Sequence, residues 1–310
     1  MTRVTESREP LTSEFAYLPG QAERLGLEAP SARRLTLPLD DGRLLSAIRY
    51  GEGAPRVVLL HGAGLNAHTW DATAIALDDG AIAIDLAGHG DSSWRDDADY
   101  APGTLAPDVI RGLETWTTGP VVLAGHSLGG LTAAAVAAAR ADLVRAVVIV
   151  DITPDIDASP GLEHLRRFYE QADFPSRDAV VERAQAFGLG GSLEDTRRGV
   201  FLNTRVRQDG RVEWKHHFAR IAQHALAPAA DQAPGGAYAR SWDDLAALRV
   251  PLTLVRAERG FVDAAATAEL SRRVPHARVV PLDAPHNVQE VAPVELARLL
   301  RGHADGSADR

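Results

Sequence analysis

The chain contains no cysteine, and this absence removes several kinds of chemistry from consideration. Disulfide bonds, thiolate metal sites and cysteine nucleophiles are all excluded. A chain without cysteine is also compatible with a reducing cytosol. Lysine is nearly absent as well, since Lys215 is the only one among 33 basic residues.

Neither an excess of basic charge nor a long apolar run is present. The formal net charge is −9 and no basic segment concentrates positive charge, which argues against a nucleic-acid partner. No stretch reaches the roughly 18 apolar residues that a membrane span requires. Residues 1–20 are polar and lack the apolar centre of a signal peptide. We therefore expect a soluble, cytoplasmic protein without a membrane partner.

What the chain has is an alternation of apolar strand patterns with helix patterns. A length of 310 residues suits one large α/β domain with an insertion. Strands alternating with helices imply a mostly parallel sheet that helices cover on both faces. The predicted strands are 34–38, 44–50, 56–60, 81–86, 121–124, 144–150, 251–255 and 278–282. The predicted helices are 104–117, 128–140, 264–273 and 291–300.

The alternation stops between about residues 152 and 241. This segment has a helical pattern interrupted by proline and glycine, and it is too long for an ordinary loop. We interpret it as a helical cap over the carboxyl ends of the strands. The predicted organisation is an N-terminal extension (1–33), a core (34–151 and 242–301), the cap (152–241) and a flexible tail (302–310).

The strongest chemical signal is the pentapeptide Gly125-His126-Ser127-Leu128-Gly129. It follows an apolar strand and precedes an alanine-rich helix, which is the context of a nucleophile elbow. The two glycines leave room for a turn that no flanking side chain would fit, so the Ser127 hydroxyl is pushed out above the sheet edge. Ser127 is therefore the predicted nucleophile.

A serine nucleophile needs a base, and the base needs an acid that orients it. His286 is the predicted base, because it follows the last strand and comes after the serine and the acid in chain order. Asp151, at the end of the strand after the elbow helix, is the preferred acid. Asp263 and Glu258, which follow the next strand, remain alternatives.

The developing oxyanion needs backbone donors. The amide of Leu128 follows the nucleophile, and the amide of Ala63 lies in the glycine-rich turn after a neighbouring strand, so these are the predicted pair. We interpret His61 and His89 as structural. His276 and His303 are expected to be solvated. No metal site is predicted, because adjacent histidines in the set His216, His217 and His224 would point apart on a helix.

Together, these residues resemble the α/β-hydrolase family over residues 35–300. The markers are the His61-Gly62-Ala63-Gly64 turn, the segment 85–92, the elbow and the His286 loop. The resemblance implies an eight-stranded sheet, a cap after the sixth strand and a Ser–His–acid triad. Many members carry the acid in a Gly-x-x-Asp segment after the seventh strand, where this chain has Ala257-Glu258-Arg259-Gly260. Asp151-Ile152-Thr153-Pro154 is similar to the Asp-Ile-Ser-Pro segment of esterases with the acid after the sixth strand.

The predicted function is hydrolysis of a small carboxylic ester or lactone through an acyl-enzyme. The resemblance implies that haloalkane dehalogenases and epoxide hydrolases of the family use an aspartate nucleophile at the elbow. The serine at this position therefore disfavours both activities. Alternatives are a carbon–carbon bond hydrolase of a diketo acid, or a ligand-binding sensor with slow hydrolysis. We expect no cofactor, a small-molecule substrate, and a monomer or homodimer. Aromatic candidates for the pocket are Trp70, Trp94, Phe168, Tyr169, Phe201 and Trp214.

Overall fold

An eight-stranded sheet forms the centre of the computed structural model, which describes residues 13–155, 160–220, 238 and 240–307. The strand order is β1-β2-β4-β3-β5-β6-β10-β11. The pairs β1–β2 and β2–β4 are antiparallel and the remaining pairs are parallel, which confirms the predicted fold class. The strands are β1 (Ala32–Pro38), β2 (Leu44–Tyr50), β3 (Val57–Leu60), β4 (Ala81–Asp85), β5 (Val121–His126), β6 (Val144–Val150), β10 (Leu252–Arg259) and β11 (Arg278–Pro285).

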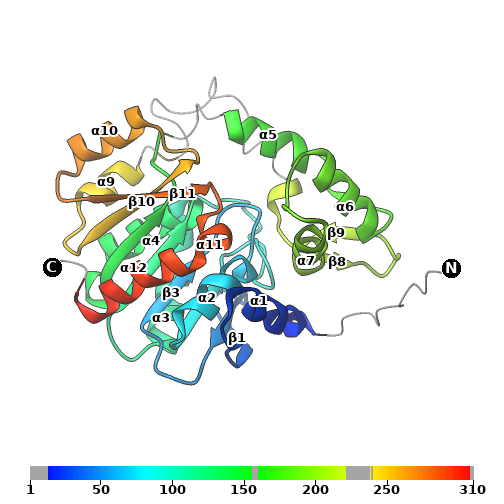
Figure 1. The fold of residues 1–310 in the computed structure, drawn as a ribbon, viewed down its shortest axis with the longest axis horizontal. Coiled ribbons are helices and arrows are strands. Elements are labelled where there is room, and N and C mark those ends of the chain that lie inside the picture. The colour runs from blue at the N-terminus through cyan, green and yellow to red at the C-terminus, as the bar shows by residue number, and fades with distance from the viewer. Residues whose placement is uncertain (1–12, 156–159, 221–237, 239, 308–310) are drawn as a thin grey trace.

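Helices cover both faces of this sheet (Figure 1). One face packs on α1 (Leu18–Leu25), α2 (Asp71–Leu77) and α12 (Pro293–Asp305), and the other on α3 (Pro102–Trp116), α4 (Leu128–Ala139), α9 (Ser241–Ala246) and α10 (Ala264–Arg273). Successive residues of a strand point to opposite faces, so Val57 and Leu59 of β3 enter one core and Val58 and Leu60 the other. Burial on both faces explains why these strands are continuous apolar runs.

A separate group of elements lies between β6 and β10 in the chain, and we call its described part, residues 160–214, the cap. It comprises α5 (Pro160–Tyr169), β7 (Asp173–Phe174), α6 (Arg177–Ala186), α7 (Leu193–Asn203), β8 (Thr204–Val206) and β9 (Val212–Trp214). The three strands form a small antiparallel sheet in the order β7-β9-β8. The sequence pattern indicated helices alone. The cap has an apolar cluster of its own, which includes Phe168, Phe174 and Trp214.

The prediction of a flexible tail over residues 302–310 is wrong for residues 302–305. Helix α12 continues to Asp305 and ends at Gly306, whose φ of 68° lies in the left-handed region that glycine adopts easily. His303, expected to be solvated, is buried on this last turn and its Nε2 lies 3.0 Å from the hydroxyl of Thr253. Arg56 donates to the carbonyl of Ala304. These tertiary contacts hold the helix beyond the glycine at position 302, which the pattern treated as its end.

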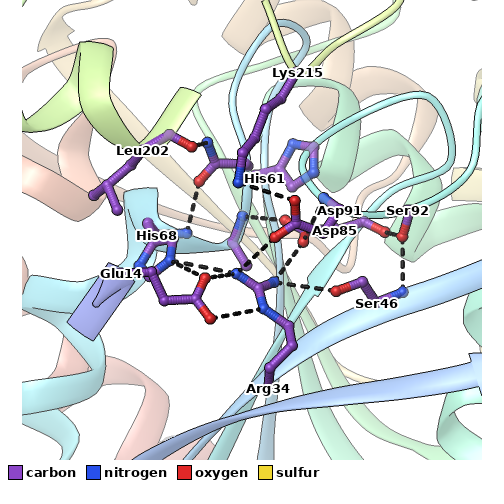
Figure 2. Close-up of polar contacts among 12 residues, drawn as sticks. Glu14, Arg34, Ser46, His61, His68, Asp85, Asp91, Ser92, Leu202 and Lys215 are labelled. Carbon is purple, nitrogen blue, oxygen red and sulfur yellow. Dashed lines mark hydrogen bonds and ion pairs between the residues drawn. The ribbon is translucent and has the colours of Figure 1, made fainter. Parts of the chain in front are cut away.

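A polar cluster joins three parts of the chain at one edge of the sheet (Figure 2). Arg34 on β1 pairs with Glu14 from the first turn (η1, Glu14–Tyr17), with Asp85 at 2.6 Å and with Asp91 at 3.3 Å. Lys215, which follows the last cap strand, pairs with Asp91 at 2.9 Å. The N-terminal segment, the sheet and the chain leaving the cap are therefore tied to the same group of charges.

The pKa of His68 in this cluster makes the stability of the fold depend on pH. Its ring lies 3.2 Å from Asp71 and 3.1 Å from Glu14. Burial alone would lower the His68 pKa, but the two carboxylates outweigh burial and raise it to about 9. The stabilisation is complete below the unfolded-state pKa of about 6.5 and is lost as the pH rises through 9.

We expect the unfolding free energy of the wild type to fall by on the order of 3 kcal/mol between pH 6.5 and 9.5, from this residue alone. Urea unfolding at both pH values measures the change. His68→Gln removes the titrating group and is expected to flatten the dependence, whereas His276→Gln, at an exposed position, keeps it. A wild-type dependence that survives in His68→Gln would contradict the assignment.

Candidate active site

Ser127 stands at a sharp turn between β5 and α4. Its backbone has φ 50° and ψ −123°, a strained conformation that non-glycine residues adopt mainly at functional sites. The flanking glycines are required by space, because a Cβ at Gly125 would overlap the backbone of Gly129. A Cβ at Gly129 would overlap the carbonyl of Leu60 on β3. The local geometry is therefore that of a nucleophile elbow.

His286 and Asp151 come together from two strand ends. His286 directly follows β11, and Asp151 directly follows β6. The Nδ1 of His286 lies 2.7 Å from Oδ2 of Asp151, whose carboxylate is completely buried. Because a carboxylate accepts, Nδ1 carries the proton and donates it, which leaves Nε2 as the acceptor on the other side of the ring. This is the tautomer that a general base requires.

The Asp151 carboxylate is held by backbone groups of β10 and of the loop that follows it. It accepts hydrogen bonds from the backbone N–H groups of Phe261 at 2.7 Å, Ala257 at 3.1 Å and Val262 at 3.4 Å. Three backbone donors satisfy a buried charge that would otherwise be costly. Asp151 itself has a φ of 52°, so both it and Ser127 occupy strained backbone positions.

Gly260 gives this loop the room to approach Asp151, so a larger residue at this position is expected to disturb the catalytic acid. A Cβ at position 260 would overlap the Asp151 carboxylate. Gly260→Ala is therefore expected to displace the carboxylate from His286 and to lower kcat about 100-fold, since a misplacement of 1 Å has that effect. Steady-state ester hydrolysis measures it. Gly119→Ala, where a Cβ meets nothing within 4 Å, is the matched control, and equal kcat values for the two variants would refute the argument.

The alternative acids are both exposed. Asp263 is exposed and caps α10, accepting from the N–H of Ala266 at 2.8 Å. Glu258 is exposed near the end of β10, and its neighbour Arg259 pairs with Asp283. Of the three carboxylates that the sequence left open, Asp151 is the one in contact with His286.

The turn that contains Ala63 is fixed by His61. Nε2 of His61 accepts from the N–H of Leu86 at 2.9 Å, so Nδ1 is the protonated nitrogen and donates to the carbonyl of Gly62 at 2.8 Å. Burial lowers the His61 pKa to about 4 and keeps the ring neutral. The Gly62 carbonyl and the Ala63 N–H belong to one trans peptide group, in which the N–H points away from the C=O. His61 thereby directs the Ala63 N–H, and Leu128, the first residue of α4, offers an N–H without an acceptor in its own helix.

The sequence reasoning missed two rings that hold His286. Phe261 stacks on the imidazole at 3.7 Å between ring centroids and 14° between planes. The His126 ring lies 4.4 Å from the His286 imidazole, measured between ring centroids. The Nε2 of His126 donates to the His286 carbonyl at 3.1 Å. Burial holds the His126 pKa well below its usual range, so this ring is neutral. A Cβ at Gly62 would lie 2.6 Å from His126, which explains the glycine there. The only local signal for His126 is its place beside the nucleophile.

A cavity of about 750 Å³ contains Ser127, His286 and Ala63 in its wall. The cap contributes apolar side chains, among them Phe168, Tyr169 and Trp214, three of the six aromatic candidates. The other three pack elsewhere: Trp70 is in the core of the sheet domain, Trp94 stacks on His217 at 4.5 Å, and Phe201 packs against Tyr17. The wall also has polar residues, which include Gln21, Arg24, Asp195, Arg198 and Glu290.

Two negative findings apply to the described residues only. Within them, no group of three or more histidine, cysteine or acidic side chains has the geometry of a metal site. Of the histidines considered for a metal, His216 stacks on Trp214, His217 lies 2.8 Å from the hydroxyl of Tyr100, and His224 is outside the described residues. No helix in this part of the chain has both the length and the hydropathy needed to cross a membrane.

Comparisons with known proteins bear on the family and the fold of the chain. The family model described as alpha/beta hydrolase family matches residues 57–299. Esterase Rv0045c of Mycobacterium tuberculosis is 38% identical over 94% of this chain and 96% of its own. A solved structure of that esterase covers 96% of this chain and all of its own, with a TM-score of 0.79 and 35% identity. The 2-(acetamidomethylene)succinate hydrolase of Mesorhizobium japonicum is 29% identical over 82% of this chain and 90% of its own.

Proposed function

Because the chain belongs to the alpha/beta hydrolase family, we propose that it hydrolyses a small carboxylic ester or lactone through a covalent acyl-enzyme. The observation that carries the proposal is the 2.7 Å hydrogen bond between His286 and the buried Asp151, beside a cavity that also contains Ser127. The similarity to an esterase at 38% identity over nearly the whole chain supports the same class of reaction.

In the proposed reaction, Ser127 Oγ attacks the carbonyl carbon of the ester and transfers its proton to Nε2 of His286. Asp151 orients the imidazole and stabilises the imidazolium. The negative charge on the former carbonyl oxygen is stabilised by the N–H groups of Ala63 and Leu128. When the intermediate collapses, the carbon–oxygen bond to the alcohol breaks and His286 gives its proton to the leaving alkoxide. Water, deprotonated by His286, then releases the acid and restores Ser127.

The walls of the cavity favour an uncharged ester with an apolar portion. Phe168, Tyr169 and Trp214 from the cap offer aromatic surface, and burial of apolar area contributes about 25 cal/mol per Å². On the polar part of the wall, Arg198 lies 3.7 Å from Glu290 and 3.9 Å from Asp195, so its charge is already countered. We therefore propose that the apolar acyl or alcohol group is bound under the cap.

The test combines covalent labelling with a substrate panel. A fluorophosphonate reacts with an activated serine and loses fluoride, so peptide mass spectrometry is expected to find the phosphonyl group on Ser127. The panel contains p-nitrophenyl acetate, butyrate and octanoate, a small lactone and a vinylogous diketo acid. We expect turnover of the esters. Labelling without turnover would favour a sensor. Faster cleavage of the diketo acid would favour carbon–carbon bond hydrolysis. The absence of both labelling and turnover would refute the assignment as a serine hydrolase.

The composition supports further proposals about the setting of this reaction. We propose a cytoplasmic protein that uses a small-molecule substrate, needs no cofactor, and is a monomer or homodimer. Light scattering coupled to gel filtration measures the oligomeric state. Full esterase activity after dialysis against EDTA is the result expected of a reaction that needs no metal.

A further inference from the structure

The turn that contains Ala63 touches the cap through one carbonyl group. The carbonyl of Gly64 accepts from Nδ2 of Asn203 at 2.7 Å and from the hydroxyl of Tyr169 at 3.3 Å. Asn203 is the last residue of α7 and Tyr169 the last residue of α5, so both donors come from helix ends of the cap. This contact joins two segments that lie far apart in the sequence.

The orientation of the Asn203 amide is set by its other partner. Its Oδ1 accepts from Nδ2 of Asn66 at 3.0 Å, which leaves Nδ2 as the group that donates to Gly64. Asn66 also donates to the carbonyl of Leu202 at 3.2 Å and accepts from the N–H of His68 at 3.0 Å. In Figure 2, Leu202 at the end of α7 lies close to His68 and the polar cluster of the sheet edge. The donor to Gly64 is therefore part of a directed hydrogen-bond network.

The turn has no spare room on the cap side. Gly64 has a φ of 73°, and a Cβ there would lie 2.6 Å from the hydroxyl of Tyr169. The N–H of Leu65 closes the turn on the carbonyl of Gly62 at 3.2 Å. Two carbonyls on either side of Ala63 are thus fixed from opposite directions, that of Gly62 by His61 from the core and that of Gly64 by Asn203 from the cap.

We propose that Asn203 is a positioning residue for the oxyanion hole, so that a seated cap completes the catalytic turn. This inference rests on the proposed serine-hydrolase function. Without Asn203, the Gly64 carbonyl keeps only the longer bond from Tyr169, and the peptide groups around Ala63 gain freedom to rotate. Because the Ala63 N–H binds the charge that develops in the transition state, loss of its orientation acts on kcat rather than on substrate binding.

The experiment compares Asn203→Ala and Asn203→Asp with the wild type on p-nitrophenyl acetate. The aspartate is nearly isosteric but has no N–H to donate. We expect both variants to lower kcat about 10- to 100-fold, which is less than deletion of an oxyanion donor, and to leave KM within about twofold. Affinity for a trifluoromethyl ketone, which forms an oxyanion on Ser127, is expected to fall in parallel. The pH dependence of kcat/KM is expected to stay unchanged, because the His286–Asp151 pair is intact.

Two further variants separate positioning from general stability of the cap. Ser192→Ala removes the N-cap of α7, whose hydroxyl accepts from the N–H of Asp195 at 3.1 Å, without touching the turn. It is expected to lower thermal stability but not kcat. Tyr169→Phe removes the longer bond and is expected to lower kcat less than the Asn203 variants do.

Unchanged kcat and inhibitor affinity in folded Asn203→Asp would overturn the proposal, and so would an equal kcat loss in Ser192→Ala. A larger KM with unchanged kcat would likewise contradict positioning and assign Asn203 to substrate contact. These outcomes differ from failure of the proposed function itself, which appears as wild-type activity in a variant without the Ser127 hydroxyl.

Discussion

Ser127→Ala is expected to lower kcat for p-nitrophenyl acetate about 10⁶-fold, the largest effect of any single substitution in this chain. The Ser127 hydroxyl is the group that forms the covalent bond to the substrate, and an alanine at position 127 has no nucleophilic atom. Loss of the nucleophile costs as much as loss of the whole triad, because the remaining members act only through it. Residual hydrolysis would come from the cavity and the oxyanion donors acting on water.

The fold of Ser127→Ala is expected to be retained, since alanine is no larger than serine and replaces it at the same strained backbone position. Circular dichroism and a thermal melt check this. Ser271→Ala, on the exposed surface of α10, is the matched control and is expected to keep wild-type kcat. If Ser127→Ala retained more than about one hundredth of the wild-type kcat, another nucleophile would have to be found.

The elbow could be predicted from the sequence because its causes are local. A buried strand, two glycines and a helix occupy consecutive positions, and each constrains only its immediate neighbours. The same is true of β2, β6 and α10, where apolar runs and a capping aspartate define bounds that the structure reproduces. Placement of His286 after the last strand also follows from chain order, because the carboxyl ends of parallel strands meet at one edge of the sheet.

The sequence favoured Asp151 as the acid, but local pattern could not exclude Asp263 and Glu258. Strands β6 and β10 are neighbours, so the side chains that follow them reach the same region. What distinguishes Asp151 is its contact with three N–H groups of β10 and the loop after it, a relation between residues more than a hundred positions apart. The small cap sheet was missed because its strands have only two or three residues, too few to show a period. The Asn203–Gly64 bond was missed because it too joins residues far apart in the sequence.

Asp151→Asn is expected to lower kcat about 10⁴-fold, the second largest effect. An asparagine has room in the site, but its amide N–H₂ only donates, so one of the two positions at which Asp151 accepts hydrogen bonds loses its acceptor. If the amide nitrogen takes the place of Oδ1, it faces the N–H groups of Ala257 and Val262, which repel it. If it takes the place of Oδ2, it faces the N–H of Phe261 and Nδ1 of His286. In the second arrangement Nδ1 must become the acceptor, so the proton moves to Nε2 and the imidazole can no longer take a proton from Ser127.

The matched control for Asp151→Asn is Asp263→Asn, the same change at the acid that caps α10. Asparagine is as good an N-cap as aspartate, so this variant is expected to keep both stability and kcat close to wild type. Glu258→Gln, at an exposed position near the end of β10, is expected to behave likewise. Measuring kcat and kcat/KM for all three separates the carboxylates. A loss of only a few-fold in Asp151→Asn, or a larger loss in Asp263→Asn, would mean that Asp151 merely satisfies the backbone donors of the β10 loop and that another acid orients His286.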